Sequence, residues 1–167
     1  EAARLFERAA TRDDLRGLTW FGLCLLRGHG MTRDVDRAVI LLRKAAQKGG
    51  LSARLAQYWL GRTLYFGLHG KRDFTEATRW LRQSANLGHH RARDLLARCC
   101  FFGRGVAEDR AEAARLWRAA ADGGSAAAMY CLGMCLYSGE GVTQDLAEAA
   151  NWFRAAARKR ITGAMFL

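Results

Sequence analysis

Apolar residues recur along the chain with the spacing of amphipathic helices, and short glycine-containing turns separate these segments. No proline interrupts the pattern, and no run of 18 or more apolar residues indicates a membrane span. The pattern predicts helix pairs, in which first helices alternate with second helices. The first helices are expected at residues 14–27, 52–66, 90–102 and 126–138, and the second helices at 35–48, 74–87, 110–122 and 146–158.

The same frame of turn and helix returns at a fixed distance along the chain. Gly103, Gly105 and Asp109 are followed 36 residues later by Gly139, Gly141 and Asp145. Self-similarity at this period is typical of stacked repeats, because one helix pair cannot bury its apolar face alone. The predicted units are residues 1–13 (the second helix of a truncated repeat), 14–49, 50–88, 89–124, 125–160, and 161–167 as the start of a further repeat.

An aspartate precedes each second helix, where an N-cap is expected to accept hydrogen bonds from the first amides. These residues are Asp34, Asp73, Asp109 and Asp145. A glutamate follows three residues later in three units, which predicts a reciprocal capping box, whereas Arg37 takes this position in the first unit. About three extra residues near residues 50–52 indicate a lengthened inter-repeat loop.

Small residues recur in mid-helix in every first helix. They form the pairs Gly17 and Gly22, Ala56 and Gly61, Ala92 and Ala97, and Ala128 and Gly133. Since glycine inside a helix costs about 1 kcal/mol relative to alanine, its recurrence predicts close packing against a neighbouring helix.

The repeat resembles the Sel-one-like repeat (SLR), a relative of the tetratricopeptide repeat. The matching residues are 128–133, 137–142, Asp145, Ala149, Trp152 and 156–157, and Leu41 takes the tryptophan position in the first unit. The resemblance implies an all-α, right-handed α-solenoid of antiparallel helix pairs whose first helices line a concave face. It also implies a scaffold or adaptor role rather than catalysis.

Cysteine usage bears on the compartment. Some secreted members of the resembled family link the two helices of each repeat by a cysteine pair eight positions apart, and this chain lacks that spacing. Its five cysteines all lie in predicted first helices. The axes of packed helices are about 8–10 Å apart, and an odd, unpaired set of cysteines on such helices favours free thiols. We expect reduced thiols and an intracellular, reducing compartment. The chain begins and ends inside repeats, so a targeting signal is not observable in it.

Catalytic and metal sites are not predicted. The four histidines lie in turns or at a helix start, and no Ser-His-Asp, HExxH or Walker-type spacing occurs. The recurring Gly-x-Gly follows a helix, which favours a turn over a phosphate site. Cys131 and Cys135 with Cys99 and His89 or His90 could be imagined as zinc ligands, but their spacing favours a packing role. We therefore expect a non-enzymatic protein with no cofactor.

One position of the first helices, together with the position four residues later, predicts a partner-binding groove. Its residues are Trp20, Cys24, Trp59, Thr63, Leu95, Cys99, Cys131 and Cys135. In the resembled family the first position often holds an asparagine that binds a partner's backbone. Here it is mostly apolar, so an apolar groove that accepts a partner helix or apolar segment is expected. The alternative is that these side chains fill the solenoid interior.

The net charge of +11 includes an arginine stripe on the second helices. It comprises Arg43, Arg82, Arg118 and Arg154, with Arg79 and Arg115 one turn before. Glu76 and Glu112 can pair with Arg79 and Arg115 at i,i+3, which leaves the other four without a partner in their own helix. The stripe is either a solvated surface or a contact for an acidic protein patch or an RNA backbone.

Two functions follow. The first is a scaffold or adaptor that binds protein partners and helps to assemble a multiprotein complex. The alternative is a basic, structural RNA-contacting subunit of a ribonucleoprotein. The sequence shows no interleaving of aromatic and basic residues typical of base-stacking surfaces, which argues against sequence-specific RNA recognition.

Overall fold

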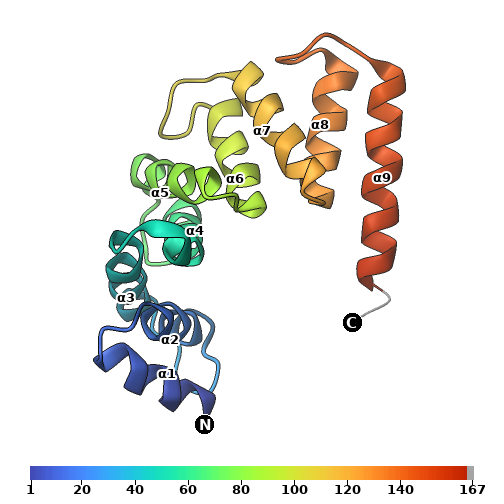
Figure 1. The fold of residues 1–167 in the computed structure, drawn as a ribbon. Coiled ribbons are helices and arrows are strands. Elements are labelled where there is room, and N and C mark those ends of the chain that lie inside the picture. Colours follow the sequence, from blue (N-terminus) through green and yellow to red (C-terminus); the bar gives the residue numbers. More distant parts are fainter. Residues whose placement is uncertain (165–167) are drawn as a thin grey trace. The chain divides into compact units, whose positions relative to one another are not determined.

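A computed structural model describes residues 1–164, and these form nine α-helices joined by short turns, with no strand in that range (Figure 1). The helices are α1 (Ala2–Thr11), α2 (Leu15–Arg27), α3 (Val35–Gln47), α4 (Gly50–Phe66), α5 (Phe74–Asn86), α6 (His90–Phe101), α7 (Arg110–Asp122), α8 (Ala126–Ser138) and α9 (Leu146–Ala164). The predicted all-α fold is confirmed.

The chain forms two compact units. Unit 1 spans Glu1–His89 and contains α1 to α5, and unit 2 begins at His90 and contains α6 to α9. Within each unit, consecutive helices pack side by side as antiparallel pairs. In unit 1, the first helix of a pair, α4, also contacts α2 of the preceding pair. Among the described helices, none is both long enough and apolar enough to cross a membrane.

The mid-helix glycines lie where a partner helix approaches closely, as predicted. A Cβ built on Gly61 would lie 2.8 Å from Cγ of Leu81, and one built on Gly133 would lie 2.7 Å from the ring of Phe153. Real Cβ atoms do not reach such distances, so a larger residue would force the facing side chain or its helix to move. Glycine is therefore required by packing within α4–α5 and α8–α9.

The helix caps explain where the second helices begin. The carboxylates of Asp34, Asp73, Asp109 and Asp145 each accept a hydrogen bond from the amide three residues later, at 2.8 to 2.9 Å. In the turns before these caps, Gly28 and Gly139 adopt φ of 72° and 74° at the ends of α2 and α8. These are left-handed conformations that residues with a Cβ rarely adopt.

The predicted capping boxes are only half formed. The amide of Asp73 donates to the carbonyl of Leu64 at 3.2 Å, and the amide of Asp145 donates to the carbonyl of Leu136 at 2.9 Å. These N-cap amides are already satisfied by the preceding first helix, so the glutamate side chains do not reach back to them. Arg37, which lacks the carboxylate, is capped by Asp34 like the others.

Two helix boundaries differ from the prediction. The expected loop at residues 50–52 is instead the first turn of α4, which begins at Gly50 after Gly49 at φ 71°. The extra residues therefore lengthen a helix and not a turn. Helix α9 continues to Ala164 instead of ending at residue 158, and residues 165–167 of the predicted further repeat lie outside the described residues.

Candidate interaction surfaces

The four groove residues predicted in unit 1 differ in exposure. Trp20 on α2 is 45% exposed and stacks against Phe6, with 6.0 Å between ring centroids. Cys24, one turn further along, is half-buried. On α4, Trp59 is only 8% exposed and Thr63 is fully buried. Trp20 and Cys24 can therefore contact a partner, whereas Thr63 fills the interior of the unit.

Two arginines cover the buried ring of Trp59. The guanidinium carbon of Arg27, the last residue of α2, lies 4.6 Å from the ring centroid, and that of Arg62 lies 5.0 Å from it. Arg62 also lies over Phe66, at 5.4 Å. We call Arg27, Trp59, Arg62 and Phe66 the arginine–tryptophan cluster. Its aromatic and basic residues lie apart in the sequence and come together only because α2 packs against α4.

The groove residues predicted in unit 2 are largely internal. Leu95, Cys99 and Cys135 are at most 7% exposed, so they fill the helix interfaces as the alternative reading expected. Cys131 is half-buried at the edge of a cavity of about 620 Å³, which Arg98, Tyr130 and Phe153 also line. Of the four groove residues predicted in unit 2, only Cys131 lines this cavity.

Two thiols of unit 2, those of Cys131 and Cys135, are held in the neutral form. Burial raises the pKa of Cys131, and burial together with neighbouring Cys131 raises the pKa of Cys135 to about 11. The thiolate is the nucleophile and the metal ligand, so both groups are weakly reactive at neutral pH. Among the described residues, no three His, Cys, Asp or Glu side chains are grouped so that they could hold a metal ion.

Arginines of the predicted stripe pair with the second helix of the next repeat. Arg43 on α3 forms two hydrogen bonds with Glu76 on α5, one of them 3.0 Å from Nη2 to Oε2. Arg118 on α7 pairs in the same way with Glu148 on α9. Sequence reasoning considered partners only within one helix and therefore missed these pairs, which form only when repeats stack.

The same interface in the first repeat carries the opposite charges. Glu7 on α1 holds the position of Arg43 and Arg118, and it pairs at 3.4 Å with Arg37, which holds the position of Glu76. The exchange explains why Arg37 replaces the expected glutamate. The acidic residue on α1 is thus matched by a basic residue on α3.

Tryptophans of two second helices complete this network. Nε1 of Trp80 donates to Glu76 at 3.0 Å, and Nε1 of Trp152 donates to Glu148 at 3.0 Å. Trp117 occurs one residue later in its helix and donates to Asp94 instead, at 3.0 Å. Glu76 and Glu148 thus each join an arginine of the preceding repeat to a tryptophan of their own helix.

This network lowers the pKa of its two carboxyl groups, those of Glu76 and Glu148. Partial burial raises the pKa of Glu76, but hydrogen bonds from Arg43 and Trp80 outweigh it, and the net pKa lies below the ordinary value. The hydrogen bond from Arg118, followed by that from Trp152, lowers the pKa of Glu148. Both side chains are therefore carboxylates at neutral pH.

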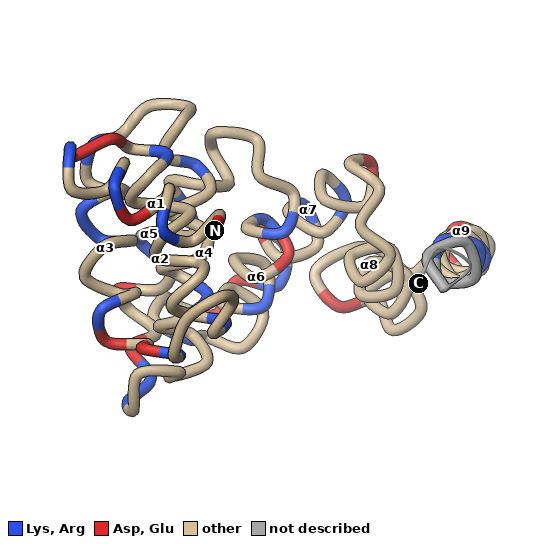
Figure 2. The backbone as a smooth tube through the Cα atoms, turned by 90° about the horizontal axis from the view of Figure 1, so that it is seen from below, with Lys and Arg blue, Asp and Glu red and all other residues tan. Residues whose placement is uncertain are grey.

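The remaining stripe arginines are exposed. Arg79 and Arg115 pair with Glu76 and Glu112 at 3.8 and 2.6 Å, which confirms the expected i,i+3 pairs. Arg154 donates to Asn151 at 2.7 Å, and Arg82 is exposed on α5. The second helices thus do not present a continuous row of unpaired cations. Figure 2 shows that Lys and Arg are spread over the helices and turns of unit 1 and interspersed with acidic residues.

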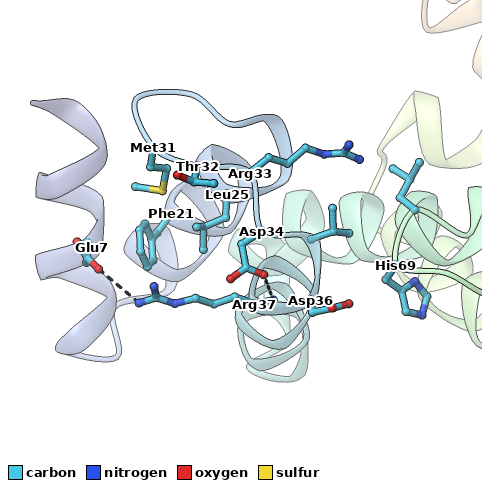
Figure 3. Close-up of a pocket in the computed structure, with 12 residues that line it drawn as sticks. Glu7, Phe21, Leu25, Met31, Thr32, Arg33, Asp34, Asp36, Arg37 and His69 are labelled. Atoms are coloured by element: carbon cyan, nitrogen blue, oxygen red, sulfur yellow. Dashed lines mark hydrogen bonds and ion pairs between the residues drawn. The ribbon is translucent and has the colours of Figure 1, made fainter.

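A polar cavity of about 670 Å³ lies beside the turn that precedes α3 (Figure 3). Arg37 crosses its floor, with its guanidinium over the ring of Phe21 at 5.2 Å and paired with Glu7. Asp34 in the wall is engaged as the cap of α3. At the far end, Nδ1 of His69 is buried and has no hydrogen-bond partner among the described residues. No nucleophile with an adjacent base lines this cavity, so its geometry does not define a catalytic site.

Antiparallel helix pairs joined by left-handed glycines, capped by aspartate and packed through mid-helix glycines define a helical-repeat protein. The chain belongs to the Sel1 repeat family, whose model matches residues 1–14, 17–50, 54–89, 90–125 and 126–160. Sel1-repeat proteins are generally non-catalytic scaffolds for protein interactions. A comparison with curated proteins found no match to the sequence.

Solved structures share this fold class, that of the Sel1-repeat solenoids. The c5321 protein, a protective antigen of uropathogenic Escherichia coli, has 26% identity and a TM-score of 0.86, covering 94% of this chain and 33% of its own. A Sel1 repeat protein of Oxalobacter formigenes has 25% identity and a TM-score of 0.83, covering 95% and 64%. Cysteine rich protein B of Helicobacter pylori has 19% identity and a TM-score of 0.57, covering 76% and 89%. The chain thus spans a third of the first of these proteins and under two thirds of the second.

Proposed function

We propose that this chain is a non-enzymatic scaffold segment that binds a protein partner through the face formed by α2 and α4. The observation that carries this proposal is the exposed ring of Trp20, 45% accessible, beside the arginine–tryptophan cluster. Aromatic and arginine side chains are the residues that most often dominate binding energy at protein interfaces. An exposed tryptophan next to cations on one face therefore favours recognition over a solely structural role.

The test is affinity capture from a native lysate with the chain as bait, at low and high salt and with and without nuclease. Trp20→Ala removes the exposed anchor without opening the core, and Ile40→Ala on α3, where Ile40 is 67% exposed, is the matched control. We expect protein partners that survive nuclease and salt, are lost with Trp20→Ala and remain with Ile40→Ala. Capture that is unchanged by Trp20→Ala would contradict the proposed face.

The alternative, an RNA-contacting subunit, rests on the net charge of +11 and on the guanidinium groups of the cluster, which have no carboxylate within 4.0 Å in the part of the chain that the structure describes. It predicts partners that disappear with nuclease and an affinity that falls steeply with salt. The same capture experiment therefore separates the two functions.

We further propose that the protein resides in a reducing compartment inside the cell. Its five cysteines form no disulfide in the described residues, and three of them are buried. Thiol titration of natively purified protein after unfolding is expected to yield all five thiols, whereas fewer would contradict this location.

A further inference from the structure

The arginine–tryptophan cluster holds two cations, Arg27 and Arg62, that are not neutralised by an acid among the described residues. Within residues 1–164, neither Arg27 nor Arg62 has a carboxylate within 4.0 Å. The corresponding position in unit 2 differs: Arg98, like Arg62, directly follows the mid-helix small residue, and it pairs with Asp94 at 3.5 Å. The missing acid is therefore a property of unit 1 and not of every repeat.

The surroundings of these cations are apolar. Phe66, beneath Arg62, is 45% exposed, and Trp20 lies seven residues before Arg27 on the same face of α2. Seven residues of α-helix span about 10 Å. The face thus offers an aromatic contact, Trp20, about 10 Å before Arg27 along the axis of α2, with half-buried Cys24 between them. Arg62 of α4 lies with Arg27 over the ring of Trp59.

We propose that this face binds an acidic segment of a protein partner, with carboxylates on Arg27 and Arg62 and an apolar side chain on Trp20. The inference rests on the proposed scaffold function and specifies the chemistry of its partner. A guanidinium group stacked on an aromatic ring keeps its N–H edge available, and that edge matches a carboxylate through two parallel hydrogen bonds.

The charge of unit 1 favours the same partner. Residues 1–89 contain 16 Arg and Lys against eight Asp and Glu, whereas residues 90–167 contain 11 against eight. An excess of positive charge around a binding face raises the encounter rate with an acidic partner and disfavours basic ones. The acidic segment is thus attracted first by unit 1 as a whole and then held by the two arginines.

An acidic protein segment fits this face better than RNA. Trp59 is 8% exposed beneath its arginines, so its ring is closed to a stacking base. Binding of a single strand also requires cations that follow the phosphates along a groove. Between Trp20 and Arg27 the surface position on α2 is Cys24, and on α4 Thr63 is buried.

The experiment is selection of peptides from a random linear library displayed on phage, with the whole chain immobilised, followed by binding measurements on synthetic copies of the enriched peptides. We expect enrichment of Asp and Glu together with an aromatic or aliphatic residue. For Arg27→Gln with Arg62→Gln, the dissociation constant of an enriched peptide should rise at least about tenfold, because two charge-assisted contacts are lost. The charge-conserving pair Arg27→Lys with Arg62→Lys should weaken binding less.

The matched control is Arg4→Gln with Lys71→Gln, which removes the same charge from two exposed positions of unit 1. It should leave the dissociation constant within about twofold, since only long-range attraction changes. Circular dichroism of each variant shows whether it remains folded, and the lysine pair keeps the test informative if the glutamine pair unfolds.

Three outcomes would overturn the inference: enriched peptides without an excess of acidic residues, equal loss of binding in both glutamine pairs, or no enriched peptide at all. A single-stranded RNA 15-mer that binds more tightly than every peptide would assign the face to nucleic acid instead. If the inference fails while lysate capture still depends on Trp20, the scaffold function stands with a partner of different chemistry.

Discussion

Arg37 and Glu7 form the same inter-repeat contact as Arg43 and Glu76, with the two charges exchanged. In both cases one residue lies on the second helix of one repeat and the other near the start of the second helix of the next. Opposite charges therefore occur at these positions in either orientation.

Reversing one charge at the α3–α5 interface is expected to destabilise unit 1, and reversing both should recover part of the loss. Arg43→Glu alone places two carboxylates together, at a cost of about 1 kcal/mol because the pair is only partly buried. Adding Glu76→Arg should restore attraction, but not the hydrogen bond from Trp80. Urea unfolding of the two single variants and the double variant measures the coupling free energy. Strict additivity would show that the pair contributes nothing.

Acid should destabilise the fold through Glu76 and Glu148. Because their pKa values in the folded protein lie below the ordinary value, their contribution is fully present above that value and is lost as the pH falls through the folded pKa. Unfolding free energies between pH 7 and pH 3 should therefore fall less steeply in Glu76→Gln than in the wild type. Glu108→Gln, at an exposed carboxylate, is the control. An identical slope in Glu76→Gln and the wild type would contradict the assignment.

Gly133→Ala should destabilise unit 2 even though alanine favours helix formation. The added Cβ would lie 2.7 Å from the ring of Phe153, and overpacking of this kind costs about 1–3 kcal/mol. Ala97→Gly at the same position of α6 should cost only about 1 kcal/mol from helix propensity. Thermal unfolding of both variants compares the two effects. A gain in stability for Gly133→Ala would mean that α8 and α9 can separate without cost.

Alkylation of Cys135 should be slow in the folded protein at neutral pH. Raising its pKa from an ordinary value of 9.0 to about 11 lowers the thiolate fraction at neutral pH roughly a hundredfold, and burial restricts access further. Iodoacetamide labelling followed by peptide mass spectrometry should show a rate that keeps rising beyond pH 9 and increases sharply in urea. Rapid labelling at pH 7 would contradict the buried, neutral thiol.

Local signals were sufficient to predict the helix pairs. The aspartate caps, the left-handed glycines and the mid-helix glycines each act within a few residues of one another or through a spacing that repeats, so the sequence displays them directly. The extra residues at 50–52 extend α4 and not a loop, a difference that composition alone does not reveal.

The candidate site was less predictable, because its chemistry depends on contacts between helices. Nothing in the sequence indicates that Arg27 of α2 covers Trp59 of α4, or that Arg43 reaches Glu76 across two turns. Trp20 and Trp59 hold one repeat position, yet one is 45% and the other 8% exposed. The difference arises from the side chains that cover each ring: Phe6 of α1 stacks against Trp20, whereas Arg27 of α2 and Arg62 of α4 cover Trp59.

The exchanged charges of Glu7 and Arg37 also fix the order in which the repeats can be arranged. Moving the repeat that contains Arg37 behind the one that contains Arg118, or duplicating it in tandem so that Arg37 follows Arg43, would set two guanidinium groups against each other. A duplication, deletion or shuffling of repeats at this point would therefore carry an electrostatic penalty that the other junctions lack. Because Arg37 needs an acidic residue on the preceding second helix, the repeats of this chain are not interchangeable modules.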